Sequence, residues 1–270
     1  MIVYGIDFTS RPSKKKPITC ITCSLQATHL VVNELQEWTS FNEFEAALQK
    51  PGPWICGIDF PFGQARRFIE TIGWPASWQD YVDLVGGISR EDFRRTLDDY
   101  RKNRQVGDKE HRRQTDIATG AISPQKIYGT PVGLMFFEGA PRLRQSSVTI
   151  PVLQKGDPQR IVVEAYPGVL AREIIGRLSY KQDTKSKQTK EQYHARLDLL
   201  RNLQSGPLQN LAGITVEAPD TIIDDPGADH LDSLLCAIQA AWAWLLRDKN
   251  FGLSDTADRI EGWIAYPVLN

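Results

Sequence analysis

The tetrapeptide Gly5-Ile6-Asp7-Phe8 returns later in the chain as Gly57-Ile58-Asp59-Phe60. In both places the aspartate ends an apolar run, 2–6 in the first copy and 54–58 in the second, and such runs are typical of buried strands. If the two strands are parallel neighbours, both carboxylates emerge at the carboxyl edge of one sheet, where open α/β sheets place ligands. The repeat therefore predicts two strands that each deliver one carboxylate to a shared site.

The residues around the repeat predict how the sheet is connected. Three strands joined by hairpins are expected at 2–8, 18–25 and 29–38. A helix follows to Gln49, because Ser40 and Glu43 have the spacing of a capping box and Pro51-Gly52-Pro53 ends it. The strand at 54–59 can then lie parallel to the first by a right-handed crossover. We expect a mixed α/β sheet whose first three strands are antiparallel and whose later strands are parallel.

The rest of the chain reads as an insertion followed by further sheet and helices. Residues 64–148 have a weak apolar pattern and helical pieces such as 90–102, which indicates a largely helical insertion or subdomain within one domain spanning 1–270. Later strands are expected at 150–153 and 161–165, helices at 169–177, up to Leu203 and at 229–246, and a final strand or extended segment at 263–268.

Composition narrows the class of protein. The chain has 270 residues, 41% hydrophobic and 24% charged, with a net charge of -1, so it is globular and has no overall electrostatic attraction to nucleic acid or membrane. The start has no signal-peptide pattern, and the longest apolar run, 234–246, is shorter than the ~20 residues of a membrane span. We expect a cytoplasmic protein that does not enter a membrane. Cys20 and Cys23 have redox or zinc spacing but lie in a β-rich run, which favours core cysteines.

Three more acids occupy positions like those of Asp7 and Asp59. Glu164 ends the apolar strand at 161–163, and Asp229 and Asp232 share one face of the first turn of an apolar helix. Each acid alone has an ordinary structural explanation, because aspartates cap turns and helices. Together they would repel unless protonated or neutralised. Mg²⁺, which prefers carboxylate oxygens, would neutralise them, and paired ions can support phosphodiester hydrolysis.

The arrangement resembles the RNase H-like superfamily, especially its RuvC-type resolvase branch. Five local words resemble the predicted-nuclease family catalogued as domain of unknown function 429: Gly5 to Asp7, Gly57 to Gly63, Glu164 to Pro167, Asp229 to Asp232, and Glu261 to Ile264. The resemblance implies an RNase H-like fold over nearly the whole chain. It also implies Mg²⁺ or Mn²⁺ held by Asp7, Asp59 and Asp232, with Glu164 and Asp229 as further catalytic residues. Function in that family is itself inferred from the fold.

A nuclease must also meet phosphates with basic residues. Lys14 to Lys16 and the lysines at 181, 185, 187 and 190 form local patches, while the arginines of 90–102 alternate with acids, which is typical of a solvated helix face. Arg112, Arg113 and Asp116, beside a Gly- and Pro-containing loop, are the expected substrate-binding residues.

The sequence thus predicts a metal-dependent nuclease that cleaves phosphodiester bonds of DNA or RNA by a two-metal-ion mechanism. Two alternatives remain open. One is a phosphotransferase or nucleotide hydrolase of the actin-like superfamily, because small hydroxyl residues follow Asp7, although that class requires glycine-rich phosphate loops and Gly86-Gly87 is the one Gly-Gly pair. The other is a non-catalytic binding module. A homodimer is also open, since resolvases of this superfamily act as dimers.

Overall fold

A seven-stranded mixed sheet forms the centre of the computed structural model, which describes residues 1–267. The strand order is β5-β6-β4-β1-β2-β3-β7. The strands are β1 (Ile2–Asp7), β2 (Ile18–Gln26), β3 (His29–Trp38), β4 (Trp54–Asp59), β5 (Val148–Thr149), β6 (Asp157–Glu164) and β7 (Thr215–Glu217). The pairs β1–β2 and β2–β3 are antiparallel, and the four other pairs are parallel. This confirms the predicted fold class.

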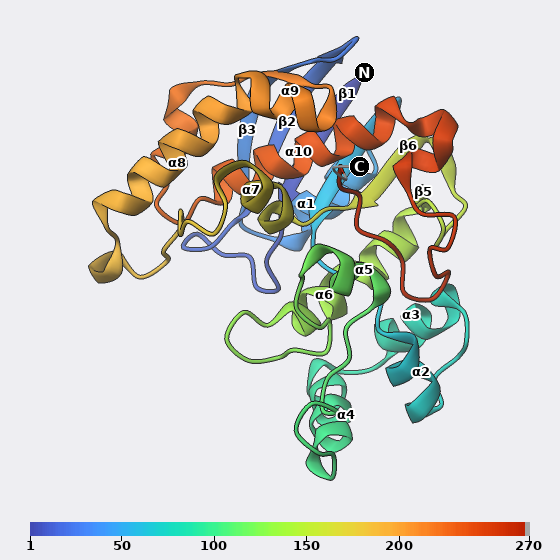
Figure 1. The fold of residues 1–270 in the computed structure, drawn as a ribbon. Coiled ribbons are helices and arrows are strands. Elements are labelled where there is room, and N and C mark those ends of the chain that lie inside the picture. The colour runs from blue at the N-terminus through green and yellow to red at the C-terminus, as the bar shows by residue number, and fades with distance from the viewer. Residues whose placement is uncertain (268–270) are drawn as a thin grey trace.

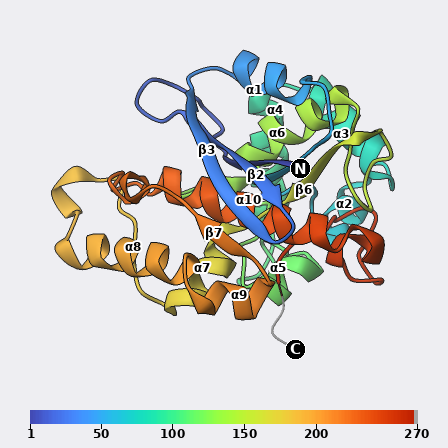
Figure 2. The ribbon, with the colours of Figure 1, turned by 90° about the horizontal axis from the view of Figure 1, so that it is seen from above.

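Helices cover both faces of the sheet, as Figures 1 and 2 show. One face carries α7 (Pro167–Ile175), α8 (Lys190–Leu203), α9 (Gly206–Ala212) and α10 (Asp229–Leu245). The other carries α1 (Phe41–Leu48), α2 (Arg66–Ile72), α3 (Trp78–Gly87), α4 (Arg90–Lys102) and α6 (Val132–Ser146). The short helix α5 (Gln114–Thr119) contacts α7 and the C-terminal segment, through Thr119 and Thr115. Short 3-10 turns lie at Lys185–Lys187, Asp220–Ile223 and Arg247–Gly252. Because side chains alternate along a strand, each face has its own core.

The central strands meet α10 through two glycines. A Cβ at Gly5 would lie 2.0 Å from the carbonyl oxygen of Ser233, and a Cβ at Gly57 would lie 2.3 Å from that of Cys236. Only glycine therefore lets the backbone of α10 lie this close to β1 and β4. The same strands pair in parallel register, with Gly5 opposite Gly57 and Asp7 opposite Asp59. The repeated tetrapeptide thus determines both the pairing of β1 with β4 and the close packing of α10 on these strands.

The helices of the predicted insertion share a core with the sheet. Phe68, Trp78 and Phe136 are fully buried in the same cluster as Cys56 and Ile58 of β4. Figure 1 shows α4 and the loops beside it extending beyond the edge of the sheet. The predicted helix at 90–102 and the capping box of Ser40 with Glu43 are both confirmed.

One expected strand is wrong. Residues 151–153 form a turn, and only Val148 and Thr149 pair as β5. Pro151 has no N–H to donate to a ladder, and Val152 has a left-handed φ of 74°, so this apolar run is buried as a turn instead.

The expected last segment, at 263–268, is extended in its described part. It makes one parallel bridge, between Ile264 and Glu164, and residue 268 lies outside the described residues. All four cysteines are buried free thiols, which confirms the prediction for Cys20 and Cys23. Among residues 1–267, no helix has the length and apolar character needed to cross a bilayer.

Candidate active site at the carboxyl edge of the sheet

Four aspartates gather where β1 and β4 end and α10 begins. Asp7 and Asp59 are register partners, and both point to the face that α10 covers, because they share the parity of Gly5 and Gly57. Asp229 and Asp232 lie in the first turn of α10, and Asp7 and Asp232 are 9% and 1% exposed. We call these four residues the acid cluster. Helix α10 begins at Asp229, after Ala228 in the left-handed region, so Asp229 is not the N-cap.

Two lysines reach the acid cluster from outside. Lys16, in the β1–β2 loop, donates to both oxygens of Asp229 at 2.7 and 3.0 Å. Lys181 donates to Oδ2 of Asp232 at 2.6 Å, and the neighbouring hydroxyl of Tyr180 donates to Oδ1 at 2.7 Å. The carboxylates of Asp7 and Asp59 receive no such bond from any residue within 1–267. The cluster is thus only half neutralised by the chain itself.

Burial and mutual repulsion raise the pKa values of these acids. Burial, and then the charges of Asp229, Asp232 and Asp59, hold the pKa of Asp7 well above its ordinary value. Burial also raises the pKa of Asp59 to about 7, although Lys181 opposes this. The carboxylate of Asp232 in turn raises the pKa of Lys181 well above its usual range. Such strongly perturbed groups in one place are typical of functional sites.

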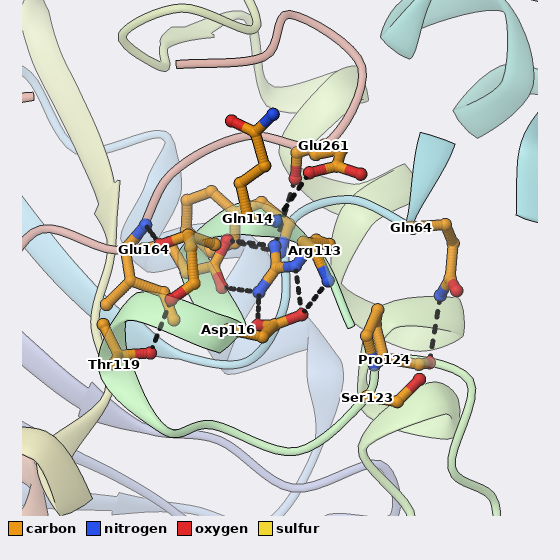
Figure 3. A network of polar contacts seen from close by, with 12 residues as sticks. Gln64, Arg113, Gln114, Asp116, Thr119, Ser123, Pro124, Glu164 and Glu261 are labelled. Atoms are coloured by element: carbon orange, nitrogen blue, oxygen red, sulfur yellow. Dashed lines mark hydrogen bonds and ion pairs between the residues drawn. The ribbon is translucent and has the colours of Figure 1, made fainter. Parts of the chain in front are cut away.

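Glu164 lies on the opposite face of the sheet and is fully engaged there. The side chain of Arg113, which is 1% exposed, donates to both oxygens of Glu164 and to both oxygens of Asp116. It also donates to the carbonyl oxygen of Glu261 at 3.1 Å. Figure 3 shows this guanidinium enclosed by its acceptors. We call Arg113, Asp116, Glu164 and Glu261 the arginine network.

The arginine network connects distant parts of the chain. The carboxylate of Glu261 accepts from the backbone N–H of Arg66, at the start of α2, and from that of Gln114, at the start of α5. Glu164 accepts from the backbone N–H of Phe62 at 2.9 Å, which fixes the turn that follows Asp59. Burial raises the pKa of Glu164 and Arg113 opposes that rise. The network therefore holds the insertion, the end of β4 and the C-terminal segment together.

The residues predicted to bind substrate separate in the structure. Arg112 is exposed, whereas Arg113 and Asp116 are buried and ion-paired. Sequence reasoning placed Lys16 and Lys181 in general basic patches and missed their contacts with Asp229 and Asp232. It did not consider Tyr180 at all. One signal was present in the sequence. Both lysines fall in loops, and buried carboxylates need cationic partners. The spacing of residues along the chain does not reveal which lysine pairs with which carboxylate.

The residue types of the acid cluster fit a hard divalent cation, because carboxylate oxygens are the ligands that Mg²⁺ prefers and Asp7 and Asp59 have free oxygens. As the side chains stand, no group of three or more His, Cys, Asp or Glu residues within 1–267 is arranged around a metal position. The ammonium groups of Lys16 and Lys181 occupy Asp229 and Asp232 instead. Binding of an ion to Asp232 would therefore require Lys181 to give way.

Fold and site together define a class: α/β proteins with a mixed sheet covered by helices on both faces and with carboxylates clustered at the ends of its central parallel strands. The particular family follows from the sequence. The profile described as "Protein of unknown function (DUF429)" matches residues 5–249, and the chain belongs to this family. Searches of curated proteins and of solved structures find no match. The predicted family is thus confirmed, and the wider resemblance to RNase H-like proteins stays a prediction.

Proposed function

We propose that this protein is a hydrolase that cleaves phosphodiester bonds of nucleic acid, DNA or RNA, in the cytoplasm, with Mg²⁺ or Mn²⁺ as cofactor. The observation that carries the proposal is the acid cluster: Asp7 and Asp59 in register at the carboxyl edge, facing Asp232 across the start of α10. Carboxylates with no cation of their own, at the edge where α/β sheets bind ligands, favour a metal-assisted reaction on phosphate over a purely structural role.

Asp7, Asp59 and Asp232 would hold the ion, which supplies charge neutralisation at the phosphate and activation of water when bound. Asp229 holds Lys16 at the edge of the site, so this lysine is placed to meet a phosphate oxygen once released. Glu164 has no free oxygen, and we assign it a positioning role through Phe62 and Arg113. Arg112 is the exposed candidate for phosphate contact, while Arg113 and Asp116 act through Glu164.

The test is cleavage of labelled single-stranded, duplex and branched DNA and RNA with Mg²⁺ or Mn²⁺. Native protein should cleave at least one substrate, and Asp59→Asn should lose activity by about 100-fold or more. Asp98→Asn, an exposed acid on α4, is the matched control and should keep full activity. Circular dichroism establishes equal folding.

A second measurement does not depend on activity. Mn²⁺ should raise the Tm of the native chain, because a ligand at ~100 times its Kd stabilises by about 2.7 kcal/mol, and Asp59→Asn should show a much smaller rise. If no substrate is cleaved, or if Asp59→Asn cleaves as well as the native chain, the proposal is wrong. Nucleotide hydrolysis would then be measured next, and failure of that too would favour the binding module.

A further inference from the structure

A pocket of about 220 Å³ opens beside the acid cluster. Asp59 and Lys181 are among its lining residues, so the pocket adjoins the place where the proposed reaction occurs. It is smaller than the roughly 300–1,000 Å³ of sites for drug-sized ligands, and it is therefore suited to a single small ring system. The function proposed above uses several lining residues but assigns no ligand to the space itself.

The walls of the pocket are mainly apolar and come from the loop and helix that follow α5. Ile122, Val132 and Met135 form one side, and Pro61 and Ile264 contribute further apolar surface. Ile122 is 41% exposed at the mouth. A methionine in the lining is favourable for an aromatic guest, because its sulfur is polarizable and makes good contacts with rings.

The polar lining contains Arg113, Asp116 and Glu164, which are paired with one another, and two further hydroxyl groups. Thr130 and Tyr166 line it, and neither side-chain hydroxyl has a hydrogen-bond partner within the described residues. The ring of Tyr166 lies against Gly168, where a Cβ would be 2.8 Å from its Cζ, so glycine at 168 gives this ring its place. Apolar walls with a few free hydrogen-bonding groups match a flat heterocycle with polar edges.

We propose that this pocket binds the nucleobase next to the phosphodiester bond that is cleaved. The proposal rests on the proposed function, since that function supplies the phosphate at Asp59. Lys181 lies at the junction between acid cluster and pocket, and can meet the phosphate that joins the base to the scissile bond. The pocket thus fits a nucleotide, with its phosphate at the acids and its base between Met135 and Tyr166.

This arrangement also defines the substrate class. A base inside a duplex is stacked and paired, and reaches a pocket beside the backbone only when it is turned out of the helix. Single strands, bulges and branch points present unpaired bases at little expense. The pocket therefore favours nucleic acid with an unpaired nucleotide at the site of cleavage over uninterrupted duplex.

The test compares two oligonucleotides of equal length and charge, one of thymidines and one whose residues are all abasic. Binding is measured by fluorescence anisotropy with Ca²⁺, and recovered probe is checked for cleavage. Native protein should bind the thymidine probe at least about fivefold more tightly, the lower range for loss of one stacked base. Val132→Trp, which fills the pocket, should abolish this preference and leave binding of the abasic probe unchanged.

A milder variant covers the case in which Val132→Trp fails to fold. Ile122→Ala removes an exposed wall residue and should reduce the preference by about threefold or more, whereas Ile117→Ala, an equally conservative change at an exposed site outside the pocket, should not. Equal binding of both probes by native protein, or an unchanged preference in Val132→Trp and Ile122→Ala, would overturn the proposal.

The two proposals fail in different ways. If no nucleic acid is cleaved but the base preference is present and lost in the variants, the hydrolase proposal fails and the base pocket stands. If Asp59→Asn abolishes cleavage while the preference is absent, the hydrolase stands and the pocket proposal is wrong. Binding of a fully paired duplex should be the same in the native chain and in Val132→Trp, and a lower affinity in the variant would contradict the inferred substrate class.

Discussion

Arg113 uses every N–H group of its guanidinium although it is almost out of contact with water. Its five donors find five acceptors, four of them the oxygens of Asp116 and Glu164 and the fifth the carbonyl of Glu261. Two carboxylates face one cation, so the group is stable only as a complete set. At the scale of single residues, this protein therefore has one closed ionic network and one open acid cluster a short distance away.

Arg113→Met tests the closed network. The change leaves Asp116 and Glu164 buried without their cation, and we expect it to lower the free energy of unfolding by about 3–5 kcal/mol. Arg112→Met, the same change at the exposed neighbour, should alter stability by no more than ~0.5 kcal/mol. Urea denaturation followed by circular dichroism measures both. Similar losses in the two variants would show that the network contributes little.

Asp59 tests the open cluster through pH. Its pKa is near 7 in the folded chain and 3.8 in the unfolded chain, so the folded state binds the proton more tightly. The resulting stabilisation is present below pH ~4 and is lost as pH rises through 7, by on the order of 4 kcal/mol. In buffer without divalent ions, Asp59→Asn should therefore gain stability relative to the native chain between pH 4 and 8. Parallel stability curves for the two proteins would contradict this.

At the scale of elements, the acid cluster depends on how closely α10 lies on β1 and β4. The two glycines of the repeated tetrapeptide remove the side chains that would separate helix from sheet. This brings the first turn of α10, with Asp229 and Asp232, to the height at which the strands end. In each tetrapeptide the glycine thus allows the close contact with α10, and the aspartate two positions later supplies a carboxylate beside the start of that helix.

Gly57→Ala should disturb the close packing of α10 on β1 and β4. Its Cβ would lie 2.3 Å from the carbonyl oxygen of Cys236, so α10 must move away, and we expect a loss of about 2 kcal/mol or more in stability together with weaker binding of Mn²⁺. Gly87→Ala, at the end of α3 with open space around it, should instead be neutral or stabilising by up to ~1 kcal/mol. Calorimetry with and without Mn²⁺ measures both effects. A native Tm for Gly57→Ala would refute the argument.

The sequence was sufficient for the central strands and for α1, α4 and α10, but not for every element or for all of their contacts. The parallel register of Asp7 with Asp59 followed from a repeated word, because both copies end their strands at the same residue. The parity of Glu164 could also have been read, since it stands one residue out of step with Asp59 and so faces the other side. The lysine partners could not, because long flexible side chains from loops choose among several acids, and only the folded chain decides.

At the scale of the whole molecule, the helices of the insertion cover one face of the sheet and complete the hydrophobic core on that face. A Cβ on Gly139 of α6 would be 2.4 Å from the ring of Phe60, so this glycine leaves room for the ring. Phe93 and Leu97 of α4 belong to the same buried cluster as Ile6 and Ile58 of the sheet. Each face of the sheet thus needs its own set of helices.

Removal of residues 64–148 should therefore abolish folding and not merely a substrate contact. The change exposes the apolar face of β1 and β4, and we expect an insoluble product or one without a cooperative unfolding transition. Replacement of 104–108 alone by a short Gly-Ser linker should leave the Tm within a few degrees, because this loop contributes no residue to the core. A soluble, cooperatively folded deletion product would show that the insertion is an independent unit.

Glu261 is synthesised long after the residues that it anchors. A ribosome adds roughly 5–20 residues per second, and Glu261 follows Arg66 by 195 positions and Arg113 by 148. Helix α2 therefore emerges roughly 10–40 seconds before the acceptor that anchors its first turn, and α5 with Arg113 roughly 7–30 seconds before it. During that interval the nascent polypeptide has the aspartates of both tetrapeptides but not the fastening that secures their surroundings, so translation itself delays the maturation of the site.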